Sequence, residues 1–244
     1  MMNKVALITH VTKYVGPGVL PALLEAGFKV MCHDKTFCDE KKRKFFEMQY
    51  PNVFTSYDKN PGVLVDSTIK QCGRIDLFIS NDVYPLQYLK IDEISAIDIR
   101  EAAEALLVWP FCLLGKVADK MKQQKKGYII LITSAAADHP KVGFSIYSSV
   151  RASASVLARA AARELAAYHI TVNAIAPNFL ESETYYPPEL WKTEKNKKEL
   201  VKLVPIGRLG RPDEIGAFII FLASGKVDFI TGEVINFTGG WPLQ

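Results

Sequence analysis

Residues 128–176, YIILITSAAADHPKVGFSIYSSVRASASVLARAAARELAAYHITVNAIA, contain the pattern that decides the fold. The apolar runs at 128–133 and 170–176 have the length and the branched side chains of buried strands. Residues 147–168, which lie between them, have the spacing of a long helix. Two buried strands joined by a helix predict a parallel crossover unit.

The same alternation of strand and helix extends over the whole chain. It is typical of a parallel sheet with helices on both faces, so we expect a single doubly wound α/β domain over residues 1–244. The further strands are expected at 5–9, 29–32, 75–80 and 233–237, and the further helices at 18–26, 98–123 and 215–223.

One segment, 181–203, interrupts this alternation. Its first half, ETYYPPELW, is aromatic and directly follows the end of an expected strand. Ligands of parallel sheets bind at that edge, so we expect a lid or a pocket wall there. Its second half is rich in lysine and glutamate and is expected to be solvated.

Composition excludes several classes of protein. The chain has 244 residues, 49% hydrophobic and 23% charged, with a net charge of +4, which argues against disorder. A stripe of basic residues with interleaved aromatics is missing, so nucleic acid is not an expected partner. No run approaches the roughly 20 apolar residues of a membrane helix, and the first residues do not resemble a signal peptide.

The cysteines and histidines show no spacing suited to a metal. We therefore expect no metal site, and free thiols in a reducing, cytoplasmic compartment. The cysteines are Cys32, Cys38, Cys72 and Cys112.

Three residues in the opening stretch form a candidate catalytic group. Tyr147 and Arg151 are four residues apart, so they lie on one face of the expected helix. A tyrosine with a pKa near 10 is a poor base at neutral pH, but a nearby guanidinium favours the phenolate and lowers that pKa. Ser134, at the end of a strand, would hydrogen-bond an oxygen that reacts with Tyr147. The spacing is equally compatible with a purely structural helix face.

These residues resemble the short-chain dehydrogenase/reductase superfamily. Its Ser–x12–Tyr–x3–Lys signature is present as Ser134, Tyr147 and, in place of lysine, Arg151. The resemblance covers nearly the whole chain and implies a Rossmann-like doubly wound parallel sheet. Further matching stretches are ITVNAIAPN (170–178), PIGRLGRPDEIGAFIIFLAS (205–224) and ITGEVINFTGGW (230–241).

The departures from this superfamily concern its redox cofactor. The glycine fingerprint, Thr-Gly-x3-Gly-x-Gly, is here THVTKYVG (9–16), so His10 and Tyr14 place side chains where the dinucleotide would lie. The Asn-Asn-Ala-Gly turn is SNDV (80–83), and Leu106 stands where the superfamily has an asparagine. Arginine is also a poor substitute for the catalytic lysine, which holds the nicotinamide ribose.

This combination resembles the halohydrin dehalogenases, the lyase branch of the superfamily. Their Thr-x4-(Phe/Tyr)-x-Gly motif is met by Thr9, Tyr14 and Gly16, and their Ser-Tyr-Arg triad by the three residues above. The resemblance implies that no redox cofactor is needed. The substrate is then a small vicinal haloalcohol, which is converted to an epoxide and halide, and small anions open epoxides in reverse.

The resemblance also assigns roles to residues. Ser134 binds the substrate oxygen, Tyr147 is the general base, and Arg151 stabilises the tyrosinate. The expected halide site is formed by Tyr14, Pro177, Asn178, Phe179 and Leu180, with backbone N–H groups as donors. Candidate substrate-pocket residues are Tyr84, Pro85, Tyr185 and Trp241. The two long helices predict a homotetramer by the same resemblance.

Two other functions stay open. An NAD(P)-dependent oxidoreductase would explain Asp34, which lies eighteen residues past Gly16, where such enzymes keep an acid for the ribose. Because Tyr14 blocks the glycine loop, we favour the other role of Asp34, as a cap of a turn or a helix. A catalytically dead member of the superfamily, acting as a ligand sensor, is the third hypothesis.

Overall fold

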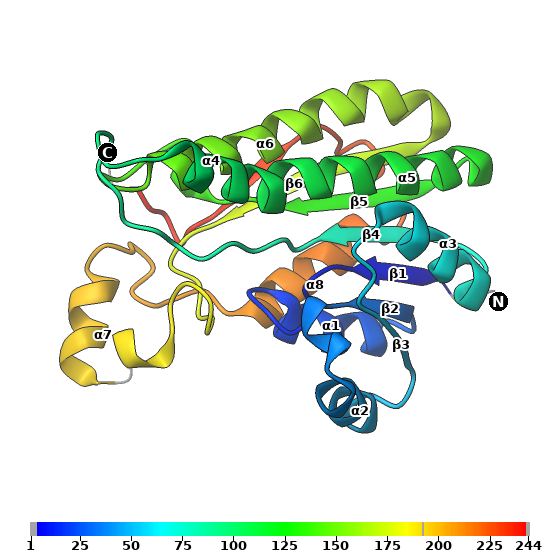
Figure 1. Ribbon diagram of the computed structural model, residues 1–244, viewed down its shortest axis with the longest axis horizontal. Coiled ribbons are helices and arrows are strands. Elements are labelled where there is room, and N and C mark those ends of the chain that lie inside the picture. Colours follow the sequence, from blue (N-terminus) through cyan, green and yellow to red (C-terminus); the bar gives the residue numbers. More distant parts are fainter. Residues whose placement is uncertain (1–3, 192, 243–244) are drawn as a thin grey trace.

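The computed structural model describes residues 4–191 and 193–242, which fold around one seven-stranded sheet (Figure 1). Its strand order is β3-β2-β1-β4-β5-β6-β7, and all neighbouring strands are parallel. The expected fold, a Rossmann-like doubly wound parallel sheet in a single domain, is confirmed. The strands are β1 (Val5–Ile8), β2 (Lys29–His33), β3 (Val53–Ser56), β4 (Leu77–Ser80), β5 (Gly127–Ile132), β6 (Ile170–Pro177) and β7 (Val234–Phe237).

Helices cover both faces of the sheet (Figure 1). The helices α3, α5 and α6 pack on one face, while α1 and α8 lie side by side on the other. The eight α-helices of the described part are α1 (Gly16–Glu25), α2 (Glu40–Gln49), α3 (Pro61–Cys72), α4 (Ala96–Ala103), α5 (Trp109–Gln124), α6 (Ser145–Leu165), α7 (Glu194–Val201) and α8 (Pro212–Leu222).

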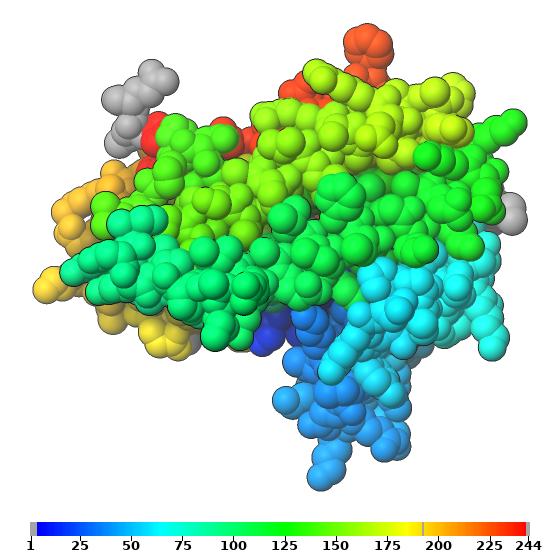
Figure 2. Space-filling view, turned by 45° about the horizontal axis from the view of Figure 1, so that its top comes forward, coloured from blue at the N-terminus to red at the C-terminus, as the bar shows by residue number. Residues whose placement is uncertain are grey.

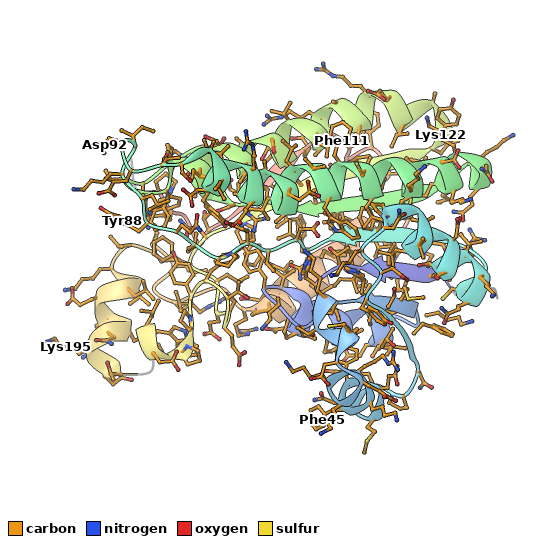
Figure 3. All side chains as sticks on the ribbon, viewed as in Figure 1. Phe45, Tyr88, Asp92, Phe111, Lys122 and Lys195 are labelled. Atoms are coloured by element: carbon orange, nitrogen blue, oxygen red, sulfur yellow. The ribbon has the colours of Figure 1, made fainter. Side chains whose placement is uncertain are left out.

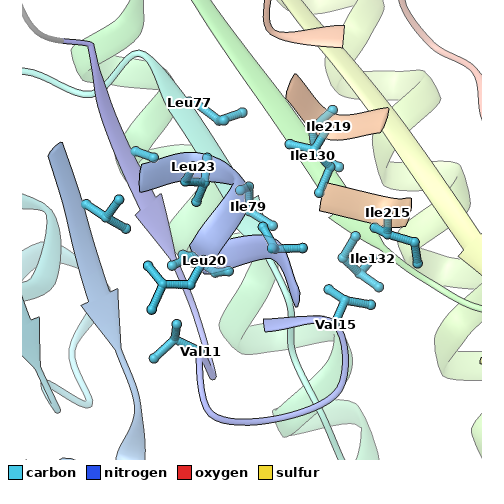
Figure 4. Packing of buried hydrophobic residues seen from close by; sticks show 14 of the residues in the cluster. Val11, Val15, Leu20, Leu23, Leu77, Ile79, Ile130, Ile132, Ile215 and Ile219 are labelled. Carbon is cyan, nitrogen blue, oxygen red and sulfur yellow. The ribbon is translucent and has the colours of Figure 1, made fainter. Parts of the chain in front are cut away.

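The buried strands supply side chains to two separate cores. In β1, Leu7 belongs to the core under α5 and α6, whereas Ala6 and Ile8 belong to the core under α1 and α8. This is the two-residue alternation of a strand that is buried on both faces. Figure 4 shows the second core, where Leu20 and Leu23 pack near Ile215 and Ile219.

The expected helix 98–123 is divided into three segments. The helices α4 and α5 are separated by a π-helical turn over Glu104–Val108. Pro110 stands at the start of α5, where its missing N–H costs little. A proline inside a regular helix clashes with the carbonyl four residues earlier, here that of Leu106, and the wider π turn relieves this conflict.

Several elements between residues 35 and 73 were not predicted. The edge strand β3 has four residues, and α2 buries only Phe46 and carries mostly charged side chains. Neither gives a strong periodic pattern. The helix α3 does have a start signal, Asn60 as its cap followed by Pro61, which the sequence reading missed.

Segment 181–203 leaves the carboxyl end of β6 and forms the lobe that carries α7 (Figure 1). Its first half contains the 3-10 turn Pro188–Leu190, and α7 has no buried residue. Lys192 lies outside the described residues. Over the described ranges, the structure has no helix that is both long and apolar enough to cross a membrane.

Candidate active site

The structure brings Ser134, Tyr147 and Arg151 together at the carboxyl edge of the sheet. Ser134 follows β5, where its Oγ accepts a hydrogen bond from the Ala136 N–H at 3.2 Å and lies 3.5 Å from the Pro177 carbonyl oxygen. Tyr147 and Arg151 lie one turn apart on α6, and the guanidinium carbon is 5.2 Å from the centroid of the Tyr147 ring. The contact of Ser134 with Pro177 is long and therefore weak, so a substrate oxygen can replace it.

Arg151 is a buried cation, and the groups that accept hydrogen bonds from its side chain are neutral. The residue is 2% exposed, and it donates to the carbonyls of Ile132 at 3.0 Å and Asp82 at 3.1 Å, and to the Tyr185 hydroxyl at 2.9 Å. Its side chain pairs with no carboxylate within the described ranges. Burial opposes the charge, yet the surrounding tyrosines, Tyr147 first, raise the pKa of Arg151. The site therefore favours a negative charge beside the guanidinium.

A cavity of about 300 Å³ opens beside these three residues. This volume is at the small end for ligand pockets, so it suits a small substrate. Lys141 carries the one charged side chain among the described residues that line it. The lining residues are Tyr14, Leu86, Ser134, Ala136, Lys141, Phe144, Tyr147, Pro177, Asn178, Leu180, Tyr185, Tyr186 and Leu190.

Tyr14 fills the turn between β1 and α1 with an aromatic ring. It is 5% exposed and has a backbone φ of +50°, and its N–H donates to the Thr184 hydroxyl at 3.1 Å. The ring stands edge-on to the Tyr185 ring at 4.8 Å, and burial raises the pKa of Tyr14 well above its usual value. At Gly16, a Cβ would lie 2.1 Å from the Val11 carbonyl oxygen, so this position needs glycine.

The loop after β6 leaves two donors unpaired at the cavity. The Asn178 N–H donates to the Phe237 carbonyl at 3.2 Å, and the Phe179 N–H donates to Asn178 Oδ1 at 2.9 Å. The Leu180 N–H and the buried Nδ2 of Asn178 have no partner among the described residues. Of the backbone N–H groups expected as halide donors in this loop, those of Asn178 and Phe179 are thus already paired, and that of Leu180 is left.

Five of the expected site residues do not line the cavity: the buried Arg151, and Phe179, Trp241, Pro85 and Tyr84. Phe179 is buried behind the wall in a cluster with Val204 and Leu209, and Trp241 packs against it with ring centroids 5.6 Å apart. Pro85 is exposed. Tyr84 instead contributes backbone groups, since its carbonyl accepts from the Tyr185 hydroxyl at 3.1 Å.

Six residues that line the cavity were not predicted from the sequence: Leu86, Ala136, Lys141, Phe144, Tyr186 and Leu190. The Tyr186 hydroxyl donates to Asn178 Oδ1 at 2.8 Å, which turns the unpaired Nδ2 of Asn178 away from it. Burial raises the pKa of Tyr186 to about 12, so the hydroxyl stays a donor at neutral pH. Tyr186 adjoins the predicted Tyr185, so the aromatic pair in this segment was a usable signal.

His10 and Asp82, in the turns after β1 and β4, form a buried pair. The Nδ1 atom of His10 is 3.1 Å from Asp82 Oδ1, and the Ser80 hydroxyl donates to the same carboxylate. Burial alone would raise the pKa of Asp82, but these hydrogen bonds hold it below its usual value. Leu106 packs in an apolar cluster with Ala102 and Val150.

Asp34 is fully used as a local acceptor. Its Oδ1 accepts from the N–H and hydroxyl of Thr36, and its Oδ2 accepts from the N–H and hydroxyl of Thr12, at 2.7–3.1 Å. These four bonds fill the acceptor positions of a carboxylate, so none is left for a ribose diol. They also hold the pKa of Asp34 below its usual value against the effect of burial. Together with the ring of Tyr14, these contacts do not fit a bound dinucleotide.

His33, next to Asp34, makes stability depend on pH. Burial, with a smaller contribution from His10, lowers the pKa of His33 from 6.5 to about 4. Because the unfolded chain takes up this proton below pH 6.5 and the native state does not, the free energy of unfolding falls as the pH drops from 6.5 to 4. We expect a loss of about 3 kcal/mol over this window, measured by urea unfolding at fixed protein concentration.

His33→Phe keeps a ring stacked on Trp109, and it should lack this part of the pH dependence. The exposed His169, changed to Asn, is the matched control and should behave as wild type. An equal pH dependence of the unfolding free energy in His33→Phe and wild type would contradict the assignment.

In residues 4–191 and 193–242, no three His, Cys, Asp or Glu side chains are placed to hold a metal ion.

The fold and the site are those of a short-chain dehydrogenase/reductase, and comparisons with known proteins lead to the same class. The family model described as enoyl-(acyl carrier protein) reductase matches residues 55–242, and the chain therefore belongs to this family of short-chain dehydrogenases/reductases. The 3-oxoacyl-[acyl-carrier-protein] reductase of Staphylococcus epidermidis is 28% identical over 246 residues, covering 98% of this chain and 99% of that protein.

Two solved structures have a higher sequence identity to this chain than that reductase. One, described as a dehalogenation enzyme, is 36% identical with a TM-score of 0.93, covering 99% of this chain and all of that one. The other is a halohydrin dehalogenase bound to ethyl (2S)-oxiran-2-ylacetate; it is 38% identical with a TM-score of 0.95, covering 99% of this chain and 98% of that one. The chain is thus similar both to reductases and, at higher identity, to dehalogenases.

Proposed function

We propose that this protein is a carbon–halogen lyase that converts small vicinal haloalcohols to epoxides and halide without a redox cofactor. Ser134 binds the substrate hydroxyl oxygen, and Tyr147 takes its proton as general base. The alkoxide oxygen then bonds to the neighbouring carbon, and the carbon–halogen bond breaks with its electron pair on the leaving halide. The reverse reaction opens an epoxide with a small anion.

The observation that carries this proposal is the environment of Arg151. A buried guanidinium without a carboxylate stands against three tyrosine rings, those of Tyr14, Tyr147 and Tyr185. Its positive charge stabilises negative charge that develops on the reacting oxygen and on a leaving halide in the adjoining cavity. A lysine here would keep the positive charge, but it could not contact both carbonyls and the Tyr185 hydroxyl as the guanidinium does. The two dehalogenase structures support the same activity.

The first test is halide and proton release from 1-chloro-2-propanol by dialysed protein without nucleotide. Catalytic release supports the lyase. The oxidoreductase hypothesis, which the reductase relatives favour, requires instead saturable NADH or NADPH binding with no halide release. A protein that does neither would be the inactive ligand sensor.

The proposed halide site makes a separate prediction. We assign the halide to the unpaired Nδ2 of Asn178 and the Leu180 N–H, with Tyr14 and Pro177 as apolar walls. Asn178→Ala removes one of two donors, so the inhibition constant of bromide should rise about tenfold. Product inhibition of halide release measures this constant. Asn196→Ala, on the exposed α7, is the control, and an unchanged constant in Asn178→Ala would contradict the assignment.

We also propose a homotetramer that is built on α5 and α6. Figure 2 shows the face that these helices form, and Phe111, labelled in Figure 3, is 54% exposed there. Together with Val108 and Val156 it leaves an apolar surface beside a shallow groove between the two helices. Such a surface is typical of an association site. A monomer in sedimentation velocity would contradict this proposal.

A further inference from the structure

Lys141 has a defined place on the cavity wall that the proposed mechanism does not use. It stands in the loop before α6, and its carbonyl accepts a turn hydrogen bond from the Phe144 N–H at 3.1 Å. Its Nζ lies 5.2 Å from the centroid of the Phe179 ring and 5.7 Å from that of Trp241. Aromatic faces attract an ammonium group, so these two rings hold the cation beside the cavity.

The charge of Lys141 is not balanced nearby. None of the ion pairs formed by the described residues includes it, and the described cavity lining has no acidic side chain. Lys141 is exposed as a whole residue, and the partial burial of its side chain lowers the pKa of the ammonium. A cation in this position stabilises an anionic group of whatever occupies the cavity.

We infer, on the basis of the proposed function, that the preferred substrates are vicinal haloalcohols that carry a carboxylate, with Lys141 as its counter-ion. For 4-chloro-3-hydroxybutanoate, the hydroxyl proton passes to Tyr147 and the oxygen bonds to carbon 4. Chloride leaves with the electrons of the broken bond, and the carboxylate is unchanged. The group that Lys141 recognises is thus remote from the reacting atoms.

The test compares this acid with its amide, which has nearly the same size but no charge. In wild type the ratio of kcat/KM for acid over amide should exceed one. In Lys141→Met the ratio should fall about fivefold, the upper range for a solvent-accessible ion pair, and it should be retained in Lys141→Arg. Lys90→Met changes the net charge equally, but Lys90 does not line the cavity, so its ratio should remain that of wild type.

A second measurement does not depend on turnover. The pair 3-hydroxybutanoate and 3-hydroxybutanamide lacks a leaving group, so calorimetry gives dissociation constants for both. Tighter binding of the acid in wild type, lost in Lys141→Met and weakened by salt, supports the inference. Equal binding of both, or an unchanged preference in Lys141→Met, overturns it. Absence of halide release from every haloalcohol would overturn the proposed lyase instead, and the binding preference would still decide the role of Lys141.

Discussion

Tyr147→Phe is expected to lower kcat/KM for halide release by about 1000-fold, because it removes the proposed general base. The substitution deletes a single hydroxyl on the cavity wall, so the fold should be retained. The measurement is chloride release from 1-chloro-2-propanol at neutral pH, with circular dichroism to check the fold. Activity within tenfold of wild type would contradict the role of Tyr147.

Two tyrosine variants serve as controls for this result. Tyr185 also contacts Arg151, but its hydroxyl is already bound to Arg151 and to the Tyr84 carbonyl. Burial raises the pKa of Tyr185 to about 12, so it is a poor base. Tyr185→Phe should therefore cost less activity than Tyr147→Phe. Tyr88→Phe, at an exposed position outside the cavity lining, should have no effect.

Arg151→Met is expected to lower kcat/KM about 100-fold at neutral pH, because the tyrosinate loses its adjacent positive charge. Activity should recover in part as the pH rises, since hydroxide can then take the substrate proton directly. Stability should fall by about 1–3 kcal/mol, because the carbonyls of Ile132 and Asp82 lose their donor. A pH–rate profile and urea unfolding measure the two effects.

Arg151→Lys separates charge from shape. A lysine keeps the positive charge but cannot contact both carbonyls and the Tyr185 hydroxyl with a planar fork, so we expect intermediate activity. Arg159→Met, two turns further along α6 and exposed, is the matched control. Wild-type activity in Arg151→Met would show that Tyr147 does not depend on this cation.

Local patterns account for the part of the molecule that was predicted correctly. The crossover unit from β5 to β6 was predicted correctly because buried strands and helices have characteristic apolar periodicities. The edge strand β3 and the exposed α2 bury few side chains, so they leave weaker patterns. The π turn before Pro110 depends on how the chain relieves one clash, which spacing alone does not show.

The same distinction applies to the candidate site. Tyr147 and Arg151 share a helix face, so their proximity follows from a four-residue interval. Lys141 and Leu86 reach the cavity only through tertiary packing, and the sequence gives no local signal for that. The Asn178 N–H was expected to be free for a halide, but its partner, the Phe237 carbonyl, lies on a strand almost sixty residues away in sequence.

The residues that depart from the superfamily pattern lie far apart in the sequence, but several of them contact one another in the structure. His10 pairs with Asp82, the Asp82 carbonyl accepts from Arg151, and Arg151 lies 5.9 Å from the centroid of the Tyr14 ring. Each substitution supplies a partner for another. Leu106 stands apart from this group, in an apolar cluster with Ala102 and Val150.

This mutual contact restricts how the protein can change. Replacing Asp82 by a small apolar residue would leave the buried His10 ring without its hydrogen-bond partner. Replacing Arg151 by lysine would weaken the hydrogen bond to the Asp82 carbonyl, in the turn after β4. A single reversion toward dinucleotide binding therefore lowers stability before any cofactor can be gained. An engineered variant that is meant to bind a dinucleotide would therefore have to change these contacting residues as a set.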